Sequence, residues 1–287
     1  MKLIIVTGLS GSGKSIALHT LEDQGFYCID NLPIRLLQAF ADQLIREREA
    51  PYQRTAVGID ARNRAEELPL VPTLARRLRD QGIACEILFL DAEHDTLIRR
   101  FSETRRKHPL TTPERPLAEA IRLEQRLMEP FQSNADLHID TTHTTVHELR
   151  DILRRRVAER PDDSGSVLLQ SFGFKHGVPR DADFVFDVRC LPNPYWQVAL
   201  RPLTGRDEAV IQFLEQDRQV LEMRDDLISF LDRWVPRFAS DGRSYLTVAV
   251  GCTGGQHRSV YMVDQIAEHF ERRGRRVLTR HRELPSL

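Results

Sequence analysis

The chain has 287 residues, 41% of them hydrophobic and 29% charged, and its 41 basic residues nearly balance 42 acidic ones for a formal net charge of −1. This length suggests about two domains, each large enough to bury a core. The balanced charge excludes a protein that is basic throughout, as many nucleic-acid-binding proteins are, but it is compatible with a local basic patch.

Targeting and redox signals are absent from the sequence. No stretch approaches the roughly 18 apolar residues of a membrane-spanning helix, and the early apolar run at 3–6 is too short for a signal peptide. The four cysteines, Cys28, Cys85, Cys190 and Cys252, lie far apart and form no CxxC pair, which indicates neither a disulfide framework nor a zinc site. We therefore predict a cytoplasmic protein with reduced thiols and no membrane partner.

The first half alternates short apolar runs with helical patterns. Strands are predicted at 3–7, 26–29, 55–59, 86–90 and 137–140. Helices are predicted at 15–24, where Gly25 is a stop signal, and around 73–81, 95–106 and 116–128. Strands separated by helices favour a parallel sheet built from βαβ units.

The second half is predicted to be a separate α/β domain. A polar stretch at 159–166, with Pro161 and Gly165, is the predicted linker between a domain at 1–158 and another at 167–287. Beyond it, strands are predicted at 167–171, 184–188, 245–250 and 277–279. Long amphipathic patterns predict helices over 208–234 and 260–272.

One motif in the first half is specific. Between a predicted strand and a predicted helix, the pattern GxxxxGK[ST] is matched by Gly8, Leu9, Ser10, Gly11, Ser12, Gly13, Lys14 and Ser15. Glycines let backbone N–H groups point at phosphate oxygens, and the helix that follows adds its positive end. Lys14 can reach the β- and γ-phosphates, and the Ser15 hydroxyl can bind Mg²⁺. The motif predicts an N-terminal sheet of the P-loop NTPase or kinase type that binds ATP or GTP.

Acidic residues follow three of the predicted strands, at the edge where open α/β sheets bind ligands, namely Asp30, Asp60 and Asp91. Each is also typical of a helix N-cap or a turn. The residues that follow Asp60 are Ala61, Arg62 and Asn63, so an acid, a guanidinium and an amide gather at one strand end. With Asp60 supporting the metal or its water, the predicted catalytic residues are Lys14, Ser15 and Asp60.

A cluster of arginines leaves a kinase open as an alternative. One predicted helix carries Arg99, Arg100, Arg105 and Arg106. Nucleotide kinases carry such arginines on a lid over the transferred phosphate, although a solvated helix face has the same appearance. No Asn-Lys-x-Asp guanine-reading motif occurs, so the sequence does not choose between ATP and GTP.

A second glycine-rich loop follows the predicted strand at 245–250. Its candidate ligand-binding residues are Cys252, Thr253, Gly254, Gly255, His257, Arg258 and Ser259. Strand, loop and helix again have the layout of an anion site, and Arg258 can hold two phosphate oxygens. The spacing also matches the Cys-x5-Arg loop of cysteine phosphatases, in which a thiolate attacks phosphorus. A binding loop, a catalytic thiol and an inert buried cysteine are all open, and we favour binding.

The chain has a basic C-terminal region. It contains Arg272, Arg273, Arg275, Arg276, Arg280 and Arg282. Such a local positive pole suits the phosphate backbone of RNA. A solvated helix end whose arginines favour the helix dipole is the alternative.

Together these motifs resemble the RapZ/YvcJ family of bacterial P-loop nucleotide-binding proteins. Besides the P-loop, the matching stretches are CIDNLP at 28–33, DARN at 60–63, SFGFKHG at 171–177, FDVRCLPNP at 186–194 and SYLTVAVGCTGGQHRS at 244–259. They follow one another along nearly the whole chain, and those of the second half are more specific than the P-loop.

The resemblance implies an ATP site at the P-loop and a GTP site at Asp60, Ala61, Arg62 and Asn63, with slow hydrolysis of both nucleotides. It also implies a regulatory RNase adapter. Such a protein binds small RNA through its C-terminal domain, presents it to an endoribonuclease and senses an amino-sugar phosphate. We assign that sugar phosphate to the loop at 252–259, and we expect a homo-oligomer.

Two features depart from the family's best-known member. The sequence ends Arg280-His-Arg-Glu-Leu-Pro-Ser-Leu287, where that member has a Lys/Arg-rich tail that helps hold RNA. Tyr195 stands where that member has a His near the sugar-phosphate pocket. The alternatives that stay open are a small-molecule kinase, a Cys-x5-Arg phosphatase in the second domain, and an RNA-binding regulator in which nucleotide is only structural.

Overall fold

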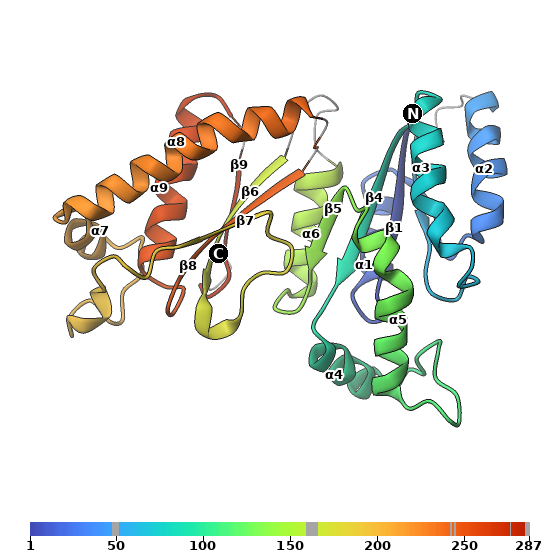
Figure 1. Ribbon diagram of the computed structural model, residues 1–287, viewed down its shortest axis with the longest axis horizontal. Helices are drawn as coiled ribbons and strands as arrows, with labels where there is room; N and C mark the ends of the chain where they lie inside the picture. Colours follow the sequence, from blue (N-terminus) through green and yellow to red (C-terminus); the bar gives the residue numbers. More distant parts are fainter. Residues whose placement is uncertain (48–51, 159–165, 242, 244, 276, 285–287) are drawn as a thin grey trace. The chain divides into compact units, whose positions relative to one another are not determined.

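The computed structural model describes residues 1–47, 52–158, 166–241, 243, 245–275 and 277–284 (Figure 1). The chain divides into two compact units, residues 1–160 and 161–287, each with its own parallel sheet and its own hydrophobic core. This confirms the predicted α/β fold class. The predicted linker lies outside the described residues, except for Ser166, which begins a strand.

The first unit contains a five-stranded parallel sheet in the order β2-β3-β1-β4-β5. The strands are β1 (Lys2–Gly8), β2 (Tyr27–Ile29), β3 (Arg54–Gly58), β4 (Ala84–Asp91) and β5 (Leu137–Asp140). The helices are α1 (Lys14–Asp23), α2 (Ile34–Glu47), α3 (Val71–Asp80), α4 (His94–Thr104), α5 (Leu117–Gln132) and α6 (Val146–Leu153), with short helical turns η2 (Leu68–Leu70) and η3 (Arg154–Ala158).

Helices cover both faces of this sheet, which explains its continuous apolar strands. Leu3 and Ile5 of β1 share a core with α2, α3 and α5, while α1 packs against α6. Ile4 and Val6 alternate with them and are equally buried, because successive side chains of a strand point to opposite faces. Since all five strands are parallel, their carboxyl ends share one edge, and the central strand β1 delivers the P-loop there.

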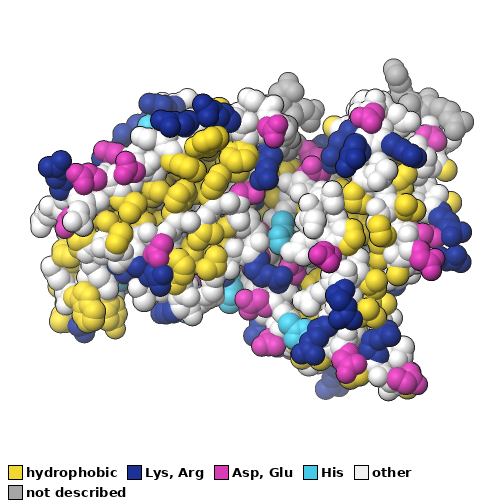
Figure 2. Space-filling view, viewed as in Figure 1, with side chains coloured by type: hydrophobic (Ala, Val, Ile, Leu, Met, Phe, Trp, Pro, Cys, Tyr) yellow, Lys and Arg dark blue, Asp and Glu magenta, His cyan; other side chains and the backbone are white. Residues whose placement is uncertain are grey.

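The second unit contains a four-stranded parallel sheet in the order β7-β8-β6-β9. The strands are β6 (Ser166–Gly173), β7 (Phe184–Asp187), β8 (Tyr245–Cys252) and β9 (Val277–His281). The helices are α7 (Glu208–Glu215), α8 (Arg218–Ser240) and α9 (Arg258–Arg272), with short turns η4 (Phe174–His176) and η5 (Pro194–Trp196). Hydrophobic side chains are visible on this unit below the long helix α8 (Figure 2).

Two sequence expectations need correction. The single helix predicted over 208–234 was wrong, because the chain breaks after Glu215 and Asp217 caps a new helix by accepting from the Gln219 N–H at 2.8 Å. Helices α2 and α6 are not among the helices that the sequence analysis predicted by residue range. The second of these begins with a capping box formed by Thr145 and Glu148, a signal that the sequence does carry.

No helix in the described part of the chain is long and apolar enough to cross a membrane.

Candidate functional site

The P-loop joins β1 to α1 at the carboxyl edge of the first sheet. Gly8 has a φ of 138° and lies so close to β4 that a Cβ there would come within 2.0 Å of the Leu90 carbonyl oxygen. Gly13 has a φ of 108° at the N-cap of α1. Side chains rarely tolerate that backbone conformation, so the geometry of the loop requires glycine at both positions.

The side chain of Lys14 folds back over the loop. Its Nζ donates to the carbonyl oxygens of Gly8 at 2.7 Å and of Leu9 at 2.9 Å. Burial lowers the pKa of Lys14, and the carboxylates of Glu124 and Asp60 offset that effect only in part. A bound phosphate would offer this ammonium group stronger acceptors than two neutral carbonyls.

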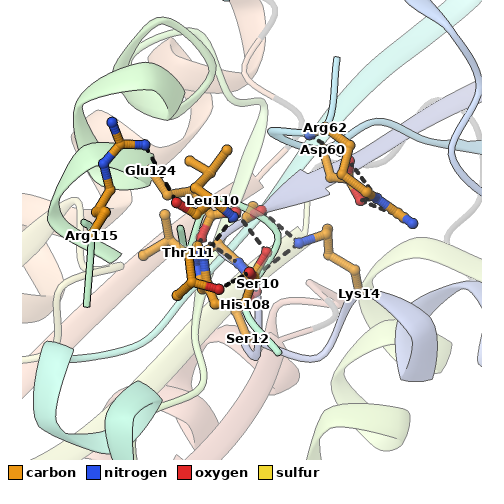
Figure 3. A network of polar contacts seen from close by, with 12 residues as sticks. Ser10, Ser12, Lys14, Asp60, Arg62, His108, Leu110, Thr111, Arg115 and Glu124 are labelled. Carbon is orange, nitrogen blue, oxygen red and sulfur yellow. Dashed lines mark hydrogen bonds and ion pairs between the residues drawn. The ribbon is translucent and has the colours of Figure 1, made fainter. Parts of the chain in front are cut away.

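A buried carboxylate lies behind the loop (Figure 3). Glu124 on α5 accepts hydrogen bonds from the backbone N–H of Ser10 at 2.9 Å and from its hydroxyl at 2.7 Å. The Nε2 atom of His108 lies 3.0 Å from Glu124 Oε2, and both side chains are 0% exposed. Burial alone would raise the pKa of Glu124, but bonds from His108 and Ser10 and the charge of Lys14 hold it below its usual value. Glu124 is therefore an ionised carboxylate at neutral pH.

The residues after β3 form a second polar group. Arg62 holds the carboxylate of Asp60, with Nε at 2.8 Å and Nη2 at 2.6 Å from Oδ2. Burial alone would raise the pKa of Asp60, but the bonds from Arg62 and the charge of Lys14 hold it below its usual value. Asn63 serves the fold, because its Oδ1 accepts from the N–H of Ile34 at the start of α2, at 3.0 Å.

A cavity of about 600 Å³ opens over the P-loop. Besides residues 10–16, it is lined by Asp60, Arg62, Arg100, Phe101, Thr104, Arg106, Lys107, Pro109, Thr141, Thr144, Thr145, Val146 and Leu149. The structure thus brings Lys14, Ser15 and Asp60 together at one cavity. Ala61 is buried in the core instead, and Asn63 is absent from this lining.

The four arginines predicted to share one helix do not do so, because α4 ends at Thr104. Arg105 ends it in a left-handed conformation, with a φ of 51°. Arg100 lines the cavity, and it donates to the carbonyl oxygens of Gly11 at 3.0 Å and of Thr141 at 2.6 Å. Arg106 also lines the cavity, whereas Arg99 does not.

The other two acids at strand ends lie outside this cavity. Asp30 follows β2, and its Oδ1 would be 2.9 Å from a Cβ at Gly58. Asp91 is buried at the end of β4 and accepts from the backbone N–H of Ala92 at 2.7 Å. Asp91 is therefore part of the fold at the sheet edge, whereas Asp30 is exposed and its charge raises the pKa of Lys14 slightly against the effect of burial.

The second glycine-rich loop joins β8 to α9. Cys252 is only 2% exposed, and its Sγ accepts from the Gly255 N–H at 3.2 Å and lies 3.2 Å from Ser259 Oγ. Burial alone would raise the pKa of the Cys252 thiol, but these bonds and the charge of Arg258 hold it below its usual value. The sulfur thus acts as a hydrogen-bond acceptor inside the loop.

Arg258 at the start of α9 is bound by the protein itself. Its Nη1 donates to the carbonyl oxygens of Arg189 and Leu191, both at 2.9 Å, and its Nη2 lies 3.4 Å from Thr253 Oγ1. Arg189 in turn pairs with Asp187 at 2.7 Å. Arg258 therefore holds the chain around 189–191 in place, next to the ion pair of Asp187 and Arg189.

The basic C-terminal residues are divided by β9. Arg272, Arg273 and Arg275 stand at the end of α9, Arg280 lies on β9, Arg282 follows it, and Arg276 lies outside the described residues. Arg272 pairs with Glu268, and Arg273 Nη1 lies 2.8 Å from Asp232 Oδ2. These pairs reduce the positive charge that the end of α9 presents.

Sequence reasoning missed Glu124, His108 and Thr141. Glu124 is 114 residues from Ser10 along the chain, and on its amphipathic helix it resembles any polar residue. His108 stands in a segment between two helices, beside Pro109. Thr141 is buried and is contacted by Arg100, 41 residues away. No local pattern marks any of the three residues, because what distinguishes them is burial and a long-range contact.

A glycine-rich loop on the central strand of a parallel sheet, with lysine and serine at one cavity, defines a P-loop α/β protein. Residues 1–160 match the model of the RapZ-like N-terminal domain, and residues 165–285 match that of the RapZ C-terminal domain. The chain therefore belongs to the RapZ family, which confirms the resemblance seen in the sequence.

Relatives resemble the chain over its full length. "Nucleotide-binding protein MCA0739" of Methylococcus capsulatus is 56% identical over 285 residues, which cover 99% of this chain and 97% of that protein. A "Nucleotide-binding protein" of Nitrosococcus oceani is 56% identical over 284 residues, which cover 99% of this chain and 100% of that protein. A shikimate kinase structure from Bacteroides thetaiotaomicron has a TM-score of 0.36 and 18% identity over 53% of this chain and 94% of its own, too little to carry an inference.

Proposed function

We propose that the first unit binds a nucleoside triphosphate, ATP or GTP, with Mg²⁺ in the cavity over the P-loop and hydrolyses it slowly. One observation carries this proposal: the P-loop, Lys14 and Ser15 line a single cavity of about 600 Å³, within the usual volume of small-molecule sites. The relatives named above, at 56% identity, are described as nucleotide-binding proteins, which supports it.

The residues present suit this ligand. The Ser15 hydroxyl lines the cavity and would supply one oxygen to Mg²⁺, which when bound neutralises phosphate charge. Lys14 would stabilise the charge of the phosphates. The Asp60 carboxylate is held by Arg62 and its pKa is lowered, so it is a weak base for a water molecule. A weak base is consistent with slow turnover and a regulatory role.

Phosphate release from Mg-ATP and from Mg-GTP tests this proposal. We expect Lys14→Ala to abolish hydrolysis, because no other lysine or arginine of the P-loop can replace its charge. Arg76→Ala, an exposed cation on α3 away from the cavity, is the control and should turn over like the unchanged chain. Unchanged turnover in Lys14→Ala would show that hydrolysis occurs elsewhere.

For the second unit we propose binding of an amino-sugar phosphate at the loop at 252–259. The loop opens onto the N-terminal end of α9, and Arg189 and Arg258 lie beside it. Calorimetry should detect binding of a hexosamine phosphate but not of the free hexosamine. Thr253→Val should weaken the binding of the hexosamine phosphate. Equal binding of both sugars would contradict a phosphate site.

RNA binding is the proposed role of the basic C-terminal region, in a cytoplasmic homo-oligomer that acts as an adapter for an endoribonuclease. We expect full-length protein to bind small RNA with an affinity that falls steeply with salt. Changing Arg275 and Arg282 together to Ala should weaken binding and flatten the salt dependence. Binding that survives Lys14→Ala but requires these arginines would favour a regulator in which nucleotide is structural.

A small-molecule kinase is a second candidate, favoured by a second cavity beside the first. Its volume is about 280 Å³, and it shares Arg62 with the nucleotide cavity. Arg35, Arg64 and Glu67 also line it, and although Glu67 pairs with Arg35, the lining keeps an excess of arginines that suits a negatively charged acceptor. Transfer of labelled phosphate from ATP to a metabolite would support this function, and release of free phosphate alone would count against it.

A further inference from the structure

We propose that Glu124 is a positioning residue of the nucleotide cavity. Through Ser10 it fixes the P-loop, and through His108 it fixes the segment at 105–116, which carries Arg106 and Lys107 to the same cavity. The proposal rests on the proposed function, namely that a nucleoside triphosphate binds there.

The bonds of Glu124 leave one arrangement for the histidine ring. His108 Nδ1 accepts from the N–H of Leu110 at 3.1 Å, so the ring proton is on Nε2, which faces Glu124 Oε2 at 3.0 Å. The same Oε2 accepts from the Ser10 N–H, and Oε1 accepts from the Ser10 hydroxyl. One carboxylate thus joins the P-loop to His108 directly (Figure 3).

His108 also organises the segment around it. Its carbonyl oxygen accepts from the Thr111 N–H at 3.1 Å and from the Thr111 hydroxyl at 2.7 Å. Arg115 Nη1 lies 3.3 Å from the Leu110 carbonyl oxygen. The residues on either side of His108, Lys107 and Pro109, line the cavity, so the bond to Glu124 is made in the middle of the stretch that faces the nucleotide.

Packing alone does not account for Glu124. An apolar side chain would fill the same space without the cost of taking a charge out of water. What Glu124 supplies here, and an apolar side chain does not, is three hydrogen bonds that join segments 114 and 16 residues away along the chain. Those two segments present different cations to one cavity: Lys14 from the P-loop, and Arg106 with Lys107 from the other side.

A functional consequence follows for the terminal phosphate. The P-loop itself binds any nucleotide with a β-phosphate, whereas cations held across the cavity favour the extra charge of a γ-phosphate. If Glu124 and His108 hold these cations in place, then breaking the link lowers affinity for the triphosphate more than affinity for the diphosphate.

The test is calorimetry on the full chain with Mg-ADP and a non-hydrolysable Mg-ATP analogue. His108→Ala leaves both Ser10 bonds to Glu124 intact. We expect it to reduce the preference for the triphosphate about tenfold, as for the loss of one charge-assisted contact, with diphosphate affinity changed less than about threefold. In a background with Arg106 and Lys107 both changed to Ala, His108→Ala should have no further effect on that preference.

Glu124 itself is tested by two variants and a control. Glu124→Gln keeps acceptors for the Ser10 N–H and His108 and a donor for the Ser10 hydroxyl, so it should retain the preference within about threefold, while Glu124→Ala should lose it. Glu129→Gln, an exposed site on α5, is the matched control.

The proposal would be overturned if His108→Ala left the preference for the triphosphate unchanged. It would also be overturned if His108→Ala reduced that preference equally with and without Arg106 and Lys107. Both outcomes can be read even if Glu124→Ala fails to fold. Failure of the unchanged chain to bind either nucleotide would instead overturn the proposed function.

Discussion

The two glycine-rich loops of this chain share a layout but differ in the group that supports them. Each follows an inner strand of a parallel sheet and leads into a helix: β1 to α1 in the first unit, and β8 to α9 in the second. Behind the first loop, the ionised carboxylate of Glu124 accepts from the Ser10 N–H. Inside the second, the Cys252 sulfur accepts from the Gly255 N–H. A glycine-rich strand–loop–helix pattern therefore indicates an anion site without indicating what holds the loop in shape.

The cations of the two loops differ in the same way. Among the residues that the structure describes, Lys14 donates hydrogen bonds to two carbonyl oxygens of its own loop, which a phosphate can replace. Arg258 is buried, and its guanidinium holds the chain at 189–191. Under the proposed function, the cation of the first loop is available to a ligand, while part of the cation of the second loop is used for structure.

Removing the carboxylate should give the largest effect on stability. Glu124→Ala leaves the Ser10 N–H and His108 Nε2 buried without an acceptor, and we expect a loss of about 3–5 kcal/mol in the free energy of unfolding. Urea unfolding of the full chain, followed by circular dichroism, measures it. Glu129→Ala should cost less than about 0.5 kcal/mol. A loss below about 1 kcal/mol for Glu124→Ala would mean that the first loop does not depend on this residue.

Removing the Cys252 sulfur from the second loop should lower the free energy of unfolding by less than Glu124→Ala does. Cys252→Ala deprives the Gly255 N–H of its acceptor, and we expect a loss of about 1–3 kcal/mol. Cys252→Ser keeps an acceptor and should lose less than Cys252→Ala in the same unfolding experiment. An equal loss in both variants would show that the sulfur fills space only. Full phosphatase activity in Cys252→Ala would exclude the cysteine-phosphatase alternative.

The pH dependence of stability should differ in sign between the loops. The pKa of Glu124 is lowered in the folded chain, so its contribution is present above its unfolded pKa and is lost as pH falls through its folded pKa. Burial beside the second loop raises the pKa of Glu283, so its contribution is present at low pH and is lost as pH rises through that raised value. Unfolding curves measured across pH should show that Glu124→Gln reduces the loss of stability as pH falls. They should also show that Glu283→Gln reduces the loss of stability as pH rises. The same change in both variants would contradict this difference.

The smallest effect is expected at the end of α9. Arg273 pairs with Asp232 at an exposed site, and such pairs contribute about 0–1 kcal/mol. Arg273→Ala should therefore leave the unfolding midpoint nearly unchanged. A loss above about 2 kcal/mol would show that this arginine is part of the fold rather than free to meet a phosphate backbone.

Much of the fold was predictable because local patterns determine it. Buried strands of a parallel sheet are continuous apolar runs, and the P-loop carries its glycines in sequence. The break at Asp217 was missed, because apolar residues at helical spacing lie on both sides of it. The end of α4 at Thr104 was missed, because the arginines that follow it are good helix formers and carry no stop signal. Glu124 and His108 were not predictable, since their role comes from burial against a loop distant in sequence. The pairing of Asp60 with Arg62 likewise depends on side-chain geometry that the spacing alone does not determine.

Amide hydrogen exchange with and without a non-hydrolysable Mg-ATP analogue tests most directly whether the two loops bind different ligands. We predict protection at residues 9–15 and around 106–109, with residues 252–259 unchanged. Protection confined to 252–259 would contradict the assignment of the nucleotide to the first loop. In Lys14→Ala the protection at 9–15 should disappear at the same nucleotide concentration.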